Sequence, residues 1–197
     1  MKRKLIIALA LCLALALGIG GTMAYLTATT TAVVNTFTIG NVGLKLVETE
    51  GENEVTTKSY TIVPGETVTK DPTVTVTTGS EPCWLFVKIT EDLGALSQSN
   101  IDFFDYLTAD GWTLVPGQTN VYYRTVGVKE GDSAIGASIP VLKDNKVTLS
   151  QNITLDMSKA LQAEGAQAPT LTFKAAAVQY DGLTTVETAF VQVPTDF

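Results

Sequence analysis

Short runs in which apolar and polar residues alternate, rich in threonine and valine, recur along most of the chain. Alternation with a period of two turns one face of an extended segment toward a core and the other toward water, which is typical of β-strands. On this pattern we predict strands at residues 33–39, 43–48, 55–63, 74–78, 84–90, 113–115, 121–128, 146–155 and 171–180.

Turn residues separate several of these runs. Pro64-Gly65 and Pro116-Gly117 suit the central positions of a type II turn, because proline fixes the first φ angle and glycine tolerates the second. Asp144-Asn145 tolerates the left-handed conformation, and Asp181-Gly182 closes the last predicted strand. Many short strands punctuated in this way favour an all-β fold, an antiparallel β-sandwich of two packed sheets, over a parallel α/β layer.

Two interruptions of the strand pattern have the spacing of short helices. Residues 93–107 place apolar residues at intervals of three to four, and leave Asn100, Asp102 and Asp105 to cap the helix or face water. Residues 157–164 repeat this spacing over a shorter length. We expect both to be short helical crossovers that cover sheet edges. Residues 184–191 fit either a terminal helix or a last edge strand, and the sequence does not choose between them.

The first 25 residues have the organisation of an export signal. Basic residues at positions 2–4 precede an apolar run over 5–17, and small residues follow it. That run is shorter than the roughly 20 residues that span a bilayer, which favours a cleaved leader over a transmembrane anchor. Thr22 and Ala24 suit cleavage before Tyr25. We therefore expect a secreted protein that touches the membrane only through the uncleaved leader.

Charge and cysteine usage agree with export. The net charge of −7 includes the three basic residues of the leader, so the processed chain would carry about −10 and would be a poor partner for nucleic acid or anionic lipid. Cys12 lies in the leader, which leaves Cys83 without an intramolecular disulfide partner. The apolar run 83–87 predicts that this thiol is buried rather than reactive.

Residues that carry catalysis or hold metals are scarce. The chain contains no histidine, which excludes HExxH zinc sites and Ser-His-Asp or Cys-His catalysis. The carboxylates of Asp102, Asp105 and Asp110 are interpreted as a solvated face. Residues 48–54 hold four glutamates but lack the ordered acidic and glycine positions of a calcium loop, so we expect a solvated hairpin. We expect no enzyme, and assign no catalytic, cofactor-binding or metal residue.

The segment after the leader is suited to strand pairing. Residues 26–38 are rich in β-branched side chains and contain no glycine, proline or charge, so they can pair through the backbone without burying a charge. The candidate strand-addition residues are Val33, Val34, Asn35, Thr36, Phe37, Thr38 and Ile39. They could complete the sheet of a second copy or form the first strand of their own domain.

Four stretches resemble the TasA and camelysin-like secreted proteins of Gram-positive bacteria, namely residues 21–26, 35–46, 63–72 and 173–183. The resemblance implies a jelly-roll domain at the cell surface or in the extracellular biofilm matrix, and fibres built by N-terminal strand addition. It also implies a SipW-type signal peptidase as a partner and cleavage before Leu26. The chain would then divide into a signal peptide, residues 1–25, and a single β-sandwich domain, residues 26–197, whose strand-forming segment is 26–39.

Three hypotheses follow for function: a structural fibre subunit, a monomeric surface adhesion or binding module, and a camelysin-like secreted protease. The lack of histidine argues against the protease, because carboxylates and one cysteine are rarely the ligand set of catalytic zinc. The fibre subunit is the preferred hypothesis.

Overall fold

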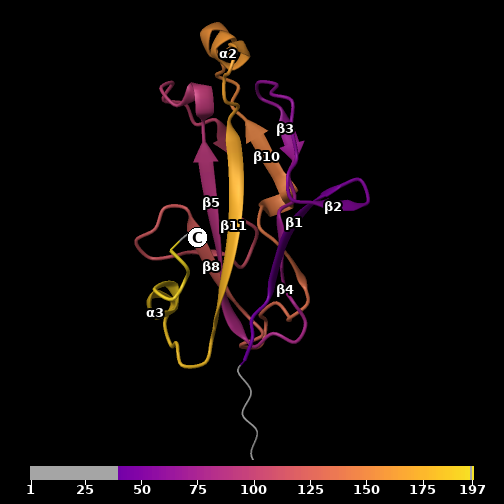
Figure 1. Ribbon diagram of the computed structural model, residues 1–197, viewed down its shortest axis with the longest axis vertical. Helices are drawn as coiled ribbons and strands as arrows, with labels where there is room; N and C mark the ends of the chain where they lie inside the picture. Colours follow the sequence, from indigo (N-terminus) through magenta and orange to yellow (C-terminus); the bar gives the residue numbers. More distant parts are fainter. Residues whose placement is uncertain (1–39, 196) are drawn as a thin grey trace, which may run out of the picture. The chain divides into compact units, whose positions relative to one another are not determined.

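The computed structural model describes residues 40–195 and 197, and within them the strands form three antiparallel sheets (Figure 1). In sheet order, the first contains β2 (Asn53–Val55), β1 (Leu44–Glu50), β4 (Thr73–Val76) and β9 (Ser138–Pro140). The second contains β3 (Thr67–Thr69), β10 (Lys146–Leu149) and β6 (Phe104–Asp105). The third contains β11 (Thr170–Gln179), β5 (Cys83–Asp92), β8 (Val121–Val126) and β7 (Thr113–Leu114).

The main core lies between the third sheet and the other two. Leu85, Val87 and Ile89 on one face of β5 pack in the same buried cluster as Val74 of β4 and Val147 of β10. Each of these side chains is at most 1% exposed. The predicted all-β antiparallel sandwich is therefore confirmed.

The opposite face of the third sheet is covered by the C-terminal segment. Trp84 and Phe86 point away from the main core and pack with Val186 and Ala189 of α3 (Val186–Phe190). Figure 1 shows α3 on the other side of this sheet from β1 and β4. Because β5 is covered on both faces, its residues 83–87 read as a continuous apolar run instead of alternating.

Cys83 is fully buried in the main core, as predicted. Burial raises the pKa of its thiol from 9.0 to about 11, because desolvation disfavours the thiolate. Cys83 should therefore resist alkylation by iodoacetamide at pH 8 in the native protein and react once urea unfolds it. The raised pKa favours folding below pH 9, and this contribution is lost as the pH rises from 9 to 11. Rapid labelling of the native protein, read by mass spectrometry, would contradict the burial.

The predicted helix over 93–107 is wrong. Only η1 (Gly94–Leu96), a short 3-10 helix, forms there, and β6 lies within the same range. Asn100 has a φ of 44°, which a continuing right-handed helix does not allow. The apolar spacing arises because Leu96 and Phe103 both enter a buried cluster with Leu149 at one end of the sandwich. Asp105 accordingly lies on a strand and not on a helix face.

Two predicted strands are too long. The 55–63 run is a strand only as far as Val55, at the end of β2. The 146–155 run ends at Leu149, and α2 (Leu155–Gln162) follows, with the Thr154 hydroxyl accepting a hydrogen bond from the Met157 amide at 3.3 Å. The helix predicted over 157–164 is thus present but starts earlier. The open choice at 184–191 is decided in favour of a helix, α3.

The turn predictions hold. Gly65 and Gly117 have φ angles of 75° and 77°, and Asp144 and Asn145 each have a φ of 54°, within η2 (Lys143–Asn145). The glutamate-rich stretch forms the predicted hairpin, in which Glu50 of β1 pairs with Asn53 of β2, and Glu50, Glu52 and Glu54 are exposed as predicted. Glu48 is the exception, because its side chain is only 14% exposed and pairs with Lys70. The strands β3, β6 and β9 were not predicted; each has only two or three residues and shows little alternation, although the equally short β7 was predicted at 113–115.

Candidate functional site

The strand β11 lies at the edge of its sheet and pairs with β5 over its whole length. The Tyr180 amide donates to the Pro82 carbonyl at 2.9 Å, one position beyond the Gln179–Cys83 pair. Because hydrogen-bonded and non-hydrogen-bonded pairs alternate along an antiparallel ladder, the even-numbered residues of β11 bond to β5. Leu171, Phe173 and Ala175 therefore direct their N–H and C=O groups to the free edge. None of these groups has a backbone partner in the part of the chain that the structure describes.

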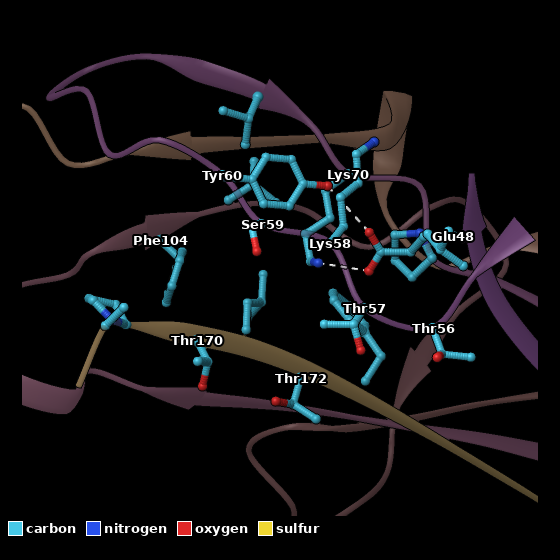
Figure 2. Close-up of a pocket in the computed structure, with 18 of the residues that line it drawn as sticks. Glu48, Thr56, Thr57, Lys58, Ser59, Tyr60, Lys70, Phe104, Thr170 and Thr172 are labelled. Atoms are coloured by element: carbon cyan, nitrogen blue, oxygen red, sulfur yellow. Dashed lines mark hydrogen bonds and ion pairs between the residues drawn. The ribbon is translucent and has the colours of Figure 1, made fainter. Parts of the chain in front are cut away.

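A groove runs beside this edge. A pocket of about 650 Å³ lies between β11, β1, the segment that follows β2, and residues of β3 and β10 (Figure 2). A second hollow of about 480 Å³ lies further along β11, beside Ala175 and Ala176. Leu46 of β1 and Phe173 of β11 line both hollows, so the two hollows lie next to each other beside the strand, and together they are called the groove.

A nearly buried ion pair lies in the wall of the first pocket. Lys70 is only 8% exposed, and its Nζ lies 2.7 Å from Oε1 of Glu48. The Lys70 Nζ also lies 5.3 Å from the ring centroid of Tyr60 and 5.4 Å from that of Phe173. These aromatic contacts are favourable for a cation that has lost water. The groove therefore presents apolar and aromatic surface with its buried charge already paired.

Tyr60 links this ion pair to the segment that covers the pocket. Its hydroxyl donates to Oε2 of Glu48 at 3.3 Å. Desolvation raises the pKa of Tyr60, and the negative charge of Glu48 and the hydrogen bond to it raise it further. The phenol therefore stays protonated and acts as a hydrogen-bond donor. The hydrogen bond to Glu48 helps to hold the segment that carries Tyr60 in place.

The predicted processing and strand-addition residues lie outside the described residues, namely Ala24, Tyr25, Leu26 and 33–39. Within the described part of the chain, no three histidine, cysteine, aspartate or glutamate residues are grouped so as to hold a metal ion. The tryptophans are structural: Trp84 Nε1 donates to the Leu183 carbonyl at 3.1 Å, and Trp112 Nε1 donates to the Pro140 carbonyl at 2.8 Å.

Sequence reasoning did not find the groove. The 171–180 run predicts a strand, but its sequence does not say which side of that strand lacks a partner. Lys70 stands between Thr69 and Asp71 in a polar stretch, where a charged residue gives no sign of burial. The one usable signal was the lack of charge in residues 26–38, which predicts that this segment pairs as a strand with the edge of a sheet.

Comparison with known proteins gives no relative: no protein-family model, curated protein or solved structure matches the chain. In residues 40–195 and 197, no helix has the length and apolar character needed to cross a membrane.

Proposed function

We propose that this chain is a secreted structural protein of the cell surface or extracellular biofilm matrix, which assembles into fibres by N-terminal strand addition. The observation that carries the proposal is the edge of β11 that has no backbone partner among the described residues, together with the groove beside it. A long unpaired edge is a template for strand pairing, and soluble proteins usually cover or interrupt such edges. In this proposal residues 26–39 of a second copy cover it.

The incoming segment suits the groove in charge and in side chains. Residues 26–38 carry no charge, and the buried charge of the groove is already paired between Lys70 and Glu48. Each net backbone hydrogen bond contributes about 1 kcal/mol. Each buried valine, isoleucine or phenylalanine adds about 1.5–3 kcal/mol, offset by the entropy cost of ordering the segment. Pairing of this kind joins two different surfaces, so it extends into a filament when the rotation between copies does not close a ring.

Processing would control assembly. While the leader is attached, residues 26–39 are tethered to the membrane and cannot reach a neighbour's groove. Cleavage by a SipW-type peptidase would release the segment and start the growth of fibres. The proposal needs no catalytic residue, cofactor, metal or nucleic acid.

Purified protein beginning at Leu26 should form filaments above a threshold concentration, and protein held in lipid vesicles by its uncleaved leader should not. Electron microscopy and sedimentation before and after leader removal measure this. A processed protein that stays monomeric at every concentration would contradict the proposal.

The pocket itself favours a second candidate, a monomeric surface module that binds a small ligand. Its volume of about 650 Å³ is within the usual range of ligand sites, and aromatic and hydroxyl side chains line it. This candidate predicts saturable ligand binding by a protein that remains monomeric after processing.

A further inference from the structure

The segment Thr56–Ile62, which follows β2, has the character of a strand but pairs with no strand in the part of the chain that the structure describes. Its side chains alternate: Lys58, Tyr60 and Ile62 are half-buried, whereas Thr57, Ser59 and Thr61 are exposed. This is the burial pattern of one strand at a sheet surface. Yet the backbone of Thr56–Ile62 makes no backbone hydrogen bond with any other described residue.

Side chains, not the backbone, hold this segment in place. The Lys58 Nζ donates to the Thr49 carbonyl of β1 at 3.0 Å, and the Tyr60 hydroxyl donates to Glu48 at 3.3 Å. Ile62 packs against the buried cluster that contains Phe103 and Leu149. The inward side chains of Lys58, Tyr60 and Ile62 therefore anchor the segment, and its backbone groups have no backbone partner among the described residues.

The segment lies across the pocket from β11. Figure 2 shows Thr57 and Ser59 on one side of the cavity and Thr170 and Thr172 on the other. Both stretches line the same pocket. The groove thus has β11 on one side and Thr56–Ile62 on the other. Among the described residues, Leu171, Phe173 and Ala175 of β11 and the whole of Thr56–Ile62 make no backbone hydrogen bond across it.

We propose that Thr56–Ile62 is the second pairing edge of the groove, so that the strand of a second copy is hydrogen-bonded on both sides, by β11 and by this segment. The inference rests on the proposed function and adds a second partner to the same site. A strand paired on both sides satisfies its N–H and C=O groups in both directions, as a central strand does. Assembly would then turn Thr56–Ile62 into a regular strand.

Hydrogen exchange of the unmodified processed protein tests this. Amide exchange is compared between dilute monomer and filaments by mass spectrometry, on peptides that cover residues 56–62 and 170–176. Filaments should slow exchange about tenfold or more at alternate amides of both stretches, since each would gain inter-strand hydrogen bonds. Amides of β5 should stay slow in both states, and those of the exposed loop residues Glu130 and Gly131 should stay fast.

The outcomes separate this inference from the proposed function. Slower exchange at 170–176 alone would overturn the second edge and leave strand addition to β11 standing. Filaments without slower exchange at either stretch would overturn both proposals. Slow exchange at both stretches already in the dilute monomer would overturn the second copy as the source of the strand.

Discussion

Replacing Ala175 by proline is expected to abolish filament growth while the processed protein still folds. The Ala175 N–H faces the free edge of β11 and has no backbone partner among the described residues, so its loss breaks no bond of the sheet. Proline is tolerated at such edge positions, but it cannot donate to an incoming strand, and its ring obstructs the approach. We expect the filament mass in a sedimentation assay to fall at least about tenfold, which corresponds to a loss of about 1.4 kcal/mol per contact.

The adjacent alanine provides a matched control. Ala176 lies opposite Phe86 in a hydrogen-bonded pair of the β5–β11 ladder. Proline there removes an internal bond and should destabilise the fold by about 3 kcal/mol or more. A175P should therefore keep the thermal unfolding temperature within a few degrees of the parent, and A176P should lower it clearly. Normal filaments from folded A175P would exclude β11 as the acceptor edge.

Replacing Glu48 by glutamine is expected to lower the free energy of unfolding by about 2–3 kcal/mol. The side chains of Lys70 and Glu48 are only 11% and 14% exposed, so the variant leaves an almost buried ammonium without its counter-charge. Breaking a buried ion pair costs about 3–5 kcal/mol, and partial solvent access reduces that figure. Urea unfolding of the dilute processed protein measures the change.

A double variant distinguishes loss of the pair from loss of packing. Glu48→Leu combined with Lys70→Met removes both charges and keeps apolar volume, so it should recover most of the stability lost in E48Q. Equal losses in E48Q and the double variant would show that the charges themselves do not matter. The double variant should also weaken the hold on Tyr60, whose hydroxyl donates to Glu48.

The long strands were predictable from sequence because the same faces of each strand are covered along most of its length. Residues 171–180 alternate over a whole strand and were placed within one residue of β11. The strand predicted over 84–90 lies within β5, although covering on both faces makes residues 83–87 a continuous apolar run without alternation. At Leu96 and Phe103 the apolar spacing comes from tertiary packing. The spacing there resembles that of a helix, although the backbone forms only a short 3-10 helix.

The acceptor side of the candidate site depends on which strands are neighbours, and a strand's own sequence does not contain that information. The strand predicted at 55–63 shows that the alternation of side chains can be predicted where backbone pairing cannot. The alternation of side chains was predicted correctly, and half-buried Tyr60 and Ile62 follow it. Regular strand structure also needs a backbone partner, and within the described residues this segment has none.

The most direct test compares two chains under the same conditions, one beginning at Leu26 and one beginning at Gly40. Electron microscopy and sedimentation report filaments, and circular dichroism reports folding. We predict filaments from the longer chain alone, with both chains folded. Equal association of the two chains, or folded monomers from both at every concentration, would contradict the claim that the N-terminal segment joins one copy to the next.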